Sequence, residues 1–489
     1  MNDLEKIMSL TWEYRPQDGC YAAEGICYCD KPVVPELQSL NIYVPETLMG
    51  KAGAVADVLA PKTPRGTVYA PADVPIVFYN DIGGYAECKP APLTPRNRRF
   101  LNDGFVLVSV GARGRQTRDA EGRACGKAPA ALVDLKAAVR WLRAHRDELP
   151  AGSTDSIVSV GTSAGGAMSS LVATSGNSAL YLPYLEQIGA CMDECDNIFA
   201  AQCYCPIVDL EHADMAYEWM FRSKRIYTMG DKRPPEVLDA AQTRLSQALA
   251  AAYPAYVNSL PLGVELGEDG RSGSYYRELM EHLSTSLEAF LQAEGTDAGD
   301  RAALLAELDP AGAFTGARDK DGTPQISDLD AYVRAYIGRM KGCPAFDPMS
   351  RASPENQELG EWGAAEGALE DKRHFAPATA KVMRSLAMDE ASAYEADLTE
   401  DRAERARLIN PMAFATGAVP SDTAPHVRIR VGSRDAGHSF SASFNLYRAL
   451  VERGVDADYG IVWGQGHCDA DRSGEFSAWV DRICGASRA

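Results

Sequence analysis

The stretch Ile157-Val158-Ser159-Val160-Gly161-Thr162-Ser163-Ala164-Gly165 decides the fold class. Its first four residues form a short run rich in β-branched side chains, which predicts a buried strand. The Gly-x-Ser-x-Gly pattern of 161–165 follows directly and opens a helical segment, an order typical of a tight turn that projects a serine hydroxyl. Glycines remove side chains that would collide in such a turn. Ser163 is therefore a candidate nucleophile, although a glycine-rich turn with an inert serine has the same pattern.

Further apolar runs lie on both sides of this turn and alternate with helical patterns. Residues 75–79 and 105–110 precede it, and each run ends in a loop that contains glycine. Residues 427–431 and 459–463 form similar runs late in the chain, separated by a helical pattern over 439–452. This alternation predicts an α/β fold with a mostly parallel central sheet that helices cover on both faces.

The middle of the chain has a different pattern. Residues 224–394 contain mainly helical patterns with many charges, for example 284–292, and no alternation of strand and helix. We predict a large, mainly helical insertion that forms a cap or lid. The chain then divides into a first core part (1–223), the insertion, and a last core part (395–489) that carries the candidate acid and histidine.

Two polar residues follow the late strand patterns. Asp435 and His467 each come shortly after a predicted strand, at the strand end where sites form in open α/β sheets. The chain order of serine, acid and histidine is that expected with this kind of turn. We predict that Ser163 attacks an acyl carbon, that His467 transfers its proton and that Asp435 orients the imidazole. His438 is the alternative base. In the alternative interpretation of the pair, Asp435 is an ordinary loop acid and His467 is a surface histidine.

Acyl transfer also requires donors for the oxyanion of the tetrahedral intermediate. The backbone N–H of Ala164, next to the candidate nucleophile, is one candidate. The loop 80–85, Asn-Asp-Ile-Gly-Gly-Tyr, resembles the glycine-rich loop after an early strand in lipases, with Asp81 where a histidine is common. Gly83 and Gly84 are therefore the second candidate, and a plain turn is the alternative.

Composition excludes several classes. The 489 residues include 49 Lys and Arg against 68 Asp and Glu, a net charge of −19, which argues against nucleic acid as a partner. No apolar run approaches the length of a membrane span, and residues 1–7 lack the pattern of a secretory signal, so we expect no membrane partner and a cytoplasmic location. The twelve cysteines are expected to be thiols, and the spacings of 191/195 and 203/205 are poor for zinc, so no metal is expected.

Several blocks of the sequence resemble the bacterial tannases, the tannin acyl hydrolases of the α/β-hydrolase superfamily. The blocks are 161–166, 204–207, 210–219, 341–347, 354–356, 428–432 and the segment around His467. The resemblance covers most of the chain. It implies an α/β-hydrolase fold with a cap, hydrolysis of galloyl esters by Ser163, Asp435 and His467, and no cofactor.

The resemblance also implies an acyl pocket. In the family, a lysine and a glutamate of the insertion bind the phenolic hydroxyls, and Lys341 and Glu355 match them. An ammonium donates to a phenol oxygen and a carboxylate accepts from one, so such a site disfavours acyl groups without hydroxyls. The family's acid two positions after the catalytic aspartate is Gly437 here, and His438 is the candidate that replaces its contact. We therefore predict a preference among phenolic acyl groups that is wider than gallate or shifted toward fewer ring hydroxyls.

The leading interpretation is thus a serine esterase of phenolic acid esters, acting through an acyl-enzyme. A general carboxylesterase or a feruloyl-type esterase would use the same residues with another acyl pocket. A non-catalytic binding protein with an α/β-hydrolase fold is the alternative from another class, and the intact set of Ser163, Asp435 and His467 disfavours it. The expected partner is a small phenolic ester, and the chain is expected to be a monomer or a homodimer.

Overall fold

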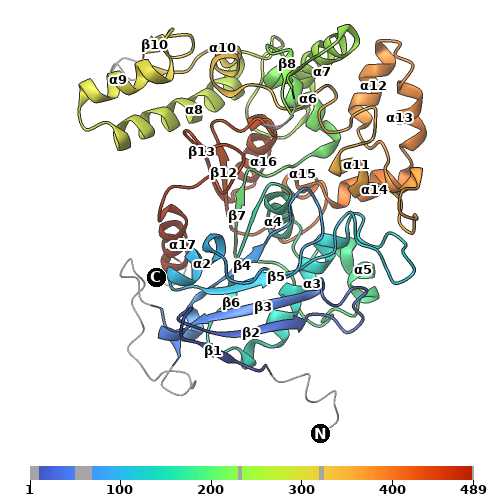
Figure 1. Ribbon diagram of the computed structural model, residues 1–489, viewed down its shortest axis with the longest axis vertical. Coiled ribbons are helices and arrows are strands. Elements are labelled where there is room, and N and C mark those ends of the chain that lie inside the picture. Colours follow the sequence, from blue (N-terminus) through green and yellow to red (C-terminus); the bar gives the residue numbers. More distant parts are fainter. Residues whose placement is uncertain (1–9, 50–68, 230–233, 319–323, 487–489) are drawn as a thin grey trace.

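A mostly parallel β-sheet runs through the centre of the molecule (Figure 1). The structure is a computed structural model that describes residues 10–49, 69–229, 234–318 and 324–486. Within these ranges the sheet has nine strands in the order β1-β2-β3-β5-β4-β6-β7-β12-β13. They are β1 (Glu13–Arg15), β2 (Cys20–Cys27), β3 (Ser39–Pro45), β4 (Pro75–Asn80), β5 (Val106–Val110), β6 (Ser153–Thr162), β7 (Ala200–Tyr204), β12 (His426–Gly432) and β13 (Asp456–Val462).

The arrangement of the strands explains their apolar sequences. Strands β5, β4, β6, β7, β12 and β13 are parallel, whereas β1, β2 and β3 extend the sheet in antiparallel fashion. Every residue of β4 and β5 is buried. Successive side chains of a strand point to opposite faces, so both faces of the sheet are covered. The predicted strands 75–79, 105–110 and 157–160 coincide with β4, β5 and part of β6, and the predicted fold class is confirmed.

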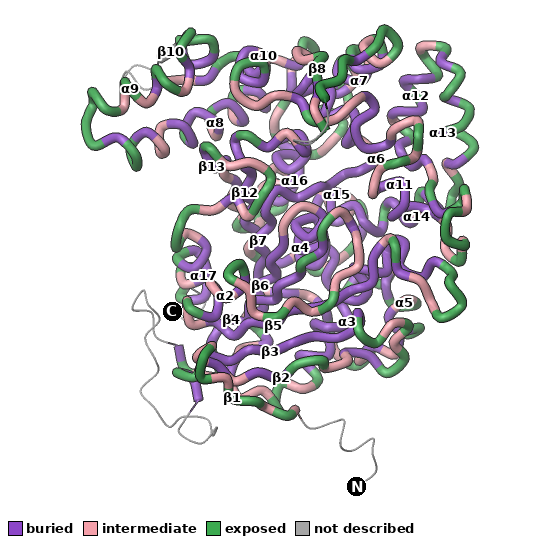
Figure 2. Tube along the Cα trace, viewed as in Figure 1, coloured by how far each residue is buried: buried purple, intermediate pink, exposed green. Residues whose placement is uncertain are grey.

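The helices that cover the sheet come from both ends of the chain. They are α2 (Pro95–Asn102), α3 (Ala130–Ala144), α4 (Ala164–Thr174), α5 (Leu182–Gln187), α6 (Leu210–Phe221), α15 (Pro411–Ala415), α16 (Phe440–Glu452) and α17 (Glu475–Ala486). Helix α4 begins at the end of β6 and packs against β6 and β7. Figure 2 shows the buried core along the sheet and these helices.

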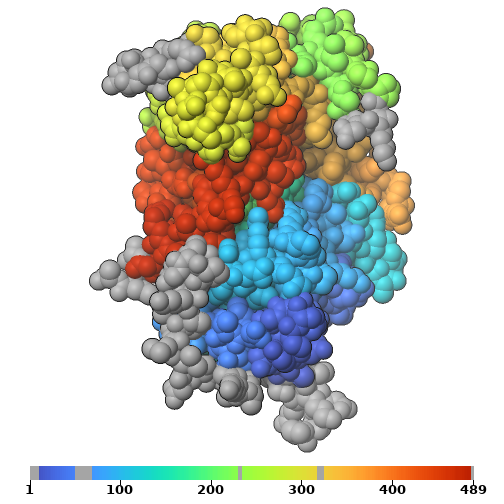
Figure 3. Space-filling view, turned by 60° about the vertical axis from the view of Figure 1, so that its left-hand side comes forward, coloured from blue at the N-terminus to red at the C-terminus, as the bar shows by residue number. Residues whose placement is uncertain are grey.

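Between α6 and α15 the chain is mainly helical. Its helices are α7 (Ala240–Ser259), α8 (Gly273–Glu294), α9 (Ala298–Leu308), α10 (Leu329–Tyr332), α11 (Pro354–Glu358), α12 (Pro377–Ser385), α13 (Ala391–Asp397) and α14 (Glu400–Leu408). Two small hairpins accompany them, β8 (Ile226–Tyr227) with β9 (Glu236–Val237) and β10 (Ala317–Arg318) with β11 (Pro324–Gln325). These elements gather at the top and right of Figure 1, and Figure 3 shows the yellow cap helices next to the red C-terminal part. The insertion boundaries at 224 and 394 stay a prediction.

Three expectations concern location and assembly. No helix within the described ranges combines the length and apolarity that a bilayer crossing requires. Residues 1–7, on which the expectation about a secretory signal rests, lie outside the described residues. The cytoplasmic location and the monomeric or homodimeric state stay predictions.

Candidate active site

Ser163 lies in a strained turn between β6 and α4. Its backbone angles, φ 62° and ψ −124°, are rarely adopted by a residue with a side chain. The turn is held because the Ser163 N–H donates to the carbonyl of Tyr204 at 2.9 Å. A Cβ atom at Gly161 would lie 2.3 Å from the Gly165 carbonyl oxygen, so glycine is required there. The sequence pattern thus forms the sharp corner that projects a serine side chain.

Asn80, which the sequence did not single out, joins this turn to the neighbouring loop. It is buried at the end of β4, and its amide donates to the carbonyls of Val160 and Gly165 at 3.2 and 3.3 Å and to the Ser169 hydroxyl at 3.0 Å. The loop is also fixed because the Gly165 N–H donates to the carbonyl of Ile82 at 2.8 Å. The only sign of this role in the sequence is that Asn80 is a polar residue directly after the apolar run 75–79.

The predicted oxyanion donors occupy different surroundings. The N–H groups of Gly83 and Ala164 donate to no acceptor within the described part of the chain, and Gly83 lines a pocket of about 510 Å³ together with Ser163 and His467. Gly84 does not line this pocket. A Cβ atom at Gly84 would lie 3.8 Å from Pro354 of the cap. Gly83 is therefore better placed than Gly84 as the donor from this loop, and Ala164, which directly follows Ser163 in the chain, stays the other candidate.

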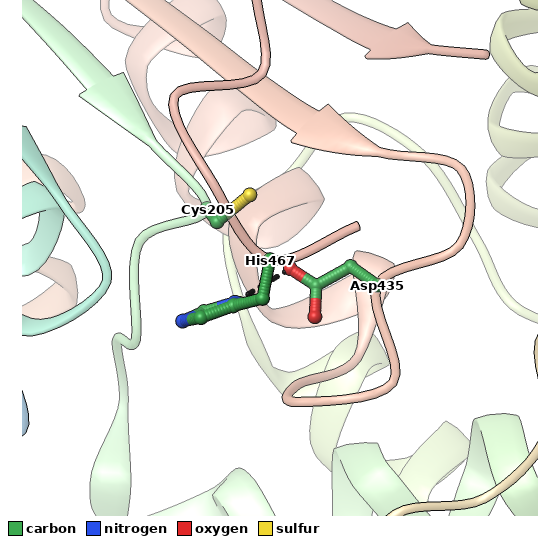
Figure 4. Close-up of side chains that lie close together, drawn as sticks. All are labelled: Cys205, Asp435 and His467. Atoms are coloured by element: carbon green, nitrogen blue, oxygen red, sulfur yellow. Dashed lines mark hydrogen bonds and ion pairs between the residues drawn. The ribbon is translucent and has the colours of Figure 1, made fainter. Parts of the chain in front are cut away.

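The predicted acid and histidine lie side by side (Figure 4). The Nδ1 atom of His467 is 2.7 Å from Oδ2 of Asp435, and the Gly437 N–H donates to Oδ1 at 2.8 Å. Asp435 is fully buried, whereas a third of the His467 side chain is exposed. Burial would raise the pKa of Asp435, but the imidazoles of His438 and His467 outweigh it and hold this pKa well below its usual range. Asp435 is therefore an ionised partner that orients His467 toward the pocket.

His438 lies behind this pair. It is buried, and its Nδ1 atom is 3.1 Å from the same Oδ2 atom of Asp435. Neither of its ring nitrogens makes a hydrogen bond of regular geometry with any residue that the structure describes. His438 does not line the pocket that contains Ser163, whereas His467 does. The geometry therefore favours His467 as the base.

Cys205 completes the group of side chains in Figure 4. A ligand atom of Cys205, of Asp435 and of His467 lie within 4.8 Å of one another, as in a metal site. However, the Cys205 thiol donates to the carbonyl of Cys468 at 3.3 Å, and burial raises its pKa well above the ordinary value. A cysteine ligand must be a thiolate, so the protonated thiol fits a packing role under the His467 loop better than metal binding.

Lys341 lies in the helical insertion, between α10 and α11. It is half-buried, and its ammonium lies 3.4 Å from the centre of the Phe346 ring. Burial lowers the pKa of Lys341, while the carboxylates of Glu355, Asp214 and Asp435 oppose this shift. Its Nζ atom donates to no acceptor within the described ranges, so it is available to a ligand.

A core helix positions Lys341. The hydroxyl of Tyr217 on α6 accepts from the Lys341 N–H at 3.0 Å and donates to the carbonyl of Ala436 at 3.0 Å. Arg339 donates to the Lys341 carbonyl at 2.8 Å and forms a fully buried ion pair with Glu218 on α6. One tyrosine, which the sequence did not single out, thus links the backbone of Lys341 to that of Ala436, the residue after Asp435.

Glu355 lies on the short cap helix α11, which two capping interactions define. The Ser353 hydroxyl accepts from the Asn356 N–H at 3.0 Å, and the Asn356 side chain accepts from the Ser353 N–H at 3.2 Å. Asn356 also donates to the buried Asp347 at 2.7 Å. Glu355 is nearly fully buried. Its carboxylate acts to raise the pKa of Lys341, the other residue predicted to bind the ring, against the lowering by burial.

Arg115 connects α11 to the oxyanion loop. Its Nε atom donates to the Gly84 carbonyl at 2.8 Å, and its guanidinium also donates to the side chain of Gln357 on α11. Its backbone N–H donates to the carbonyl of Tyr85 at 2.8 Å. The helix that carries Glu355 and the loop that carries Gly83 are therefore parts of one bonded unit.

Glu358, one turn after Glu355 on α11, gives a testable pH dependence. It is buried, and neither carboxylate oxygen has a hydrogen-bond partner among the described residues. Burial raises its pKa to about 8 despite Lys127, Arg115 and Arg405. The folded state keeps a proton that the unfolded state releases near pH 4.5, so stability falls as pH rises from about 4.5 to 8. We expect Glu358→Gln to reduce the drop in Tm between pH 5.5 and 8.5 by at least about 2 °C.

Scanning calorimetry at a series of pH values measures this difference. Glu366→Gln, at an exposed glutamate of the same cap segment, is the matched control and should follow the wild-type curve. Parallel curves for Glu358→Gln and the wild type would show that Glu358 is ionised in the folded protein.

A serine at a strained corner, an acid–histidine pair at strand ends and a mostly parallel sheet define an enzyme of the α/β-hydrolase class. Comparisons with known proteins agree. Residues 74–226 match the BD-FAE family model, and a comparison with curated proteins found no match. The structure of tannin acyl hydrolase from Lactobacillus plantarum is similar with 32% identity, 97% of each chain covered and a TM-score of 0.80.

Two further solved structures are similar over nearly the whole chain. A tannin acyl hydrolase in complex with ethyl gallate has 32% identity, a TM-score of 0.79, and coverage of 95% of this chain and 94% of that chain. The Fusobacterium nucleatum tannase has 30% identity, 95% coverage of each chain and a TM-score of 0.78. The chain therefore belongs to the bacterial tannase family, and it is a carboxylic ester hydrolase. The resemblance found in the sequence is confirmed.

Proposed function

We propose that the protein hydrolyses small esters of phenolic acids, galloyl esters or close relatives, through an acyl-enzyme on Ser163. The observation that carries the proposal is the pocket that Ser163, at its strained turn, and His467, held by the buried Asp435, line together. The similarity to a tannin acyl hydrolase in complex with ethyl gallate supports the phenolic acyl group. Lys341 and Glu355 supply a donor and an acceptor beside the catalytic pair.

The proposed reaction has two halves. The Ser163 oxygen attacks the ester carbonyl carbon while Nε2 of His467 takes the hydroxyl proton. The oxyanion accepts from the N–H groups of Ala164 and Gly83, and the bond to the alcohol oxygen then breaks as His467 returns the proton to it. Water attacks the acyl-enzyme with His467 as base again, which releases the phenolic acid and restores Ser163. Asp435 stabilises the imidazolium in both halves.

We further propose a donor–acceptor pair for the acyl ring. The Lys341 ammonium donates to one phenolic oxygen and the Glu355 carboxylate accepts from a neighbouring hydroxyl. Gly437 supplies no side chain. A Cβ atom there would lie 3.1 Å from Oδ1 of Asp435, so a side chain would extend beside the catalytic pair. His438, buried behind Asp435, stays the candidate for the third ring contact.

The acyl preference follows from these contacts. We expect wild type to cleave methyl gallate and methyl protocatechuate with kcat/KM values within about 10-fold, and methyl benzoate at least about 100-fold more slowly, because unpaired Lys341 and Glu355 disfavour a bare ring. Lys341→Met and Glu355→Gln should lower kcat/KM for the two hydroxylated esters by about 10- to 100-fold and leave methyl benzoate unchanged.

Lys381→Met on α12, at an exposed lysine of the cap, is the matched control. Steady-state kinetics with methyl ferulate in the same series separates the alternatives. Equal rates on methyl benzoate would indicate a general carboxylesterase, and a clear preference for methyl ferulate would indicate a feruloyl-type esterase. A strict requirement for gallate would contradict the widened preference that we attribute to Gly437.

A further inference from the structure

The pocket beside Ser163 has a charged wall that the ester chemistry does not use. Its lining includes Asp81, Arg96 and Asp469 in addition to Ser163 and His467. The side chains of Asp81 and Arg96 are 45% and 43% exposed, whereas Asp469 is 13% exposed. All three residues line the pocket, and Asp81 and Arg96 are the more exposed.

Asp469 holds Arg96 in place. The Nε atom of Arg96 donates to Oδ2 of Asp469 at 2.8 Å, and Nη2 donates to Oδ1, so the contact is bidentate. Arg99 donates to Oδ2 of Asp469 at 3.2 Å, and the hydroxyl of Thr162 donates to Oδ1. These four donors occupy both oxygens of Asp469. Its role is to fix the guanidinium of Arg96 next to the nucleophile turn.

Asp81 and Arg96 keep unused hydrogen-bonding groups. Oδ1 of Asp81 accepts from Nη1 of Arg96 at 2.8 Å and from the Tyr79 hydroxyl at 3.0 Å. Oδ2 of Asp81 has no partner within the described residues. Arg96 directs three of the five N–H groups of a guanidinium to carboxylates, so two remain. An acceptor and a donor thus lie side by side, which suits two neighbouring hydroxyl groups.

The position of this pair identifies the part of the ester that it meets. The acyl-ring residues Lys341 and Glu355 lie against the cap and do not line this pocket. His467 lines it and must reach the departing alcohol oxygen. The group attached to that oxygen therefore extends into this pocket, whose volume of about 510 Å³ is sufficient for a sugar-sized group.

The carboxylate of this wall that a ligand meets is that of Asp81. Asp469 is paired with both Arg96 and Arg99, whereas Asp81 shares Arg96 with Asp469 and keeps Oδ2 free of partners within the described residues. We propose that Asp81 and Arg96 form a subsite for the alcohol half of the ester, which binds neutral alcohols with neighbouring hydroxyls and disfavours alcohols that carry a carboxylate. This inference rests on the proposed function and names residues that select the leaving alcohol.

Three gallate esters with the same acyl group test the subsite. They are methyl gallate, a glucose ester of gallate, and an ester with quinate, a polyol that carries a carboxylate. We expect wild-type kcat/KM for the glucose ester to exceed that for the quinate ester by at least about 10-fold, because the quinate carboxylate faces Asp81. Asp81→Asn keeps the shape and an acceptor oxygen, and should reduce this ratio by at least about 5-fold.

Asp389→Asn, at an exposed aspartate of the cap, is the matched control for net charge and should leave the ratio unchanged. A second measurement needs no variant. Raising NaCl from 0.05 to 0.5 M should lower the wild-type ratio of kcat/KM for the glucose ester to kcat/KM for the quinate ester, because salt screens exposed charges.

Equal wild-type kcat/KM values for the glucose and quinate esters would overturn the subsite alone. An equal effect of Asp81→Asn on all three esters would overturn it too, since the residue would then act through the oxyanion loop. No wild-type turnover of methyl gallate would overturn the proposed function and the subsite with it.

Discussion

Ser163→Ala is expected to lower kcat for methyl gallate by about 10⁴- to 10⁶-fold, because no other group can form the acyl-enzyme. The strained turn that holds Ser163 tolerates alanine no worse than serine, so the fold should persist. Rapid mixing with a nitrophenyl ester should give a burst of nitrophenol in the wild type and none in the variant. Mass spectrometry of the quenched wild type should find the acyl group on the peptide that contains Ser163.

Ser385→Ala, at an exposed serine of the cap, is the matched control and should keep full activity. Unchanged activity in Ser163→Ala would refute the nucleophile assignment. A wild-type protein without activity on any ester would favour the alternative of a non-catalytic binding protein.

Asp435→Asn is expected to lower kcat by about 10⁴-fold at neutral pH, because an amide cannot stabilise the imidazolium of His467 or fix its tautomer. The low pKa of Asp435 means that the carboxylate stays ionised through the acid range, so the acid limb of the wild-type kcat/KM profile should not contain it. Steady-state kinetics between pH 4 and 9 measures both effects, and circular dichroism checks that the variant is folded.

Two histidine variants separate the alternative bases. His467→Gln should lose about as much activity as Asp435→Asn, whereas His438→Gln should lose less than about 10-fold, since only His467 lines the pocket with Ser163. A larger loss in His438→Gln than in His467→Gln would make His438 the base.

The parts of the fold that depend on local pattern were predictable. The buried strands β4 and β5 and the 157–160 part of β6 are mainly apolar runs, and the glycines of 161–165 follow from the space that the turn allows. Asp435 and His467 could be proposed because both follow strands, and parallel strands bring such residues to one edge of the sheet. Lys341 and Glu355 came from the family resemblance alone.

The supporting residues could not be predicted, because their partners are distant in sequence. Tyr217 contacts Lys341 and Ala436 across more than a hundred residues each, and Arg96 contacts Asp469 near the other end of the chain. A tyrosine on a helix or an arginine near a loop carries no local sign of such a contact. The burial of His438 behind Asp435 is equally invisible in the sequence, since a histidine in a glycine-containing loop is usually exposed.

The hydrogen bonds of Arg115 determine whether the cap wall can move when the substrate binds. Because Arg115 joins the Gly84 carbonyl to Gln357 on α11, the helix could not swing away without breaking bonds on the oxyanion loop. The wall that carries Glu355 is thus preorganised, and little ordering entropy remains to be lost when a ring binds. Substrates should then be distinguished by their fit to a fixed cavity, with entry and product exit on the Asp81 side. A cap of this kind acts as a fixed wall against the acyl ring and does not open and close as a lid.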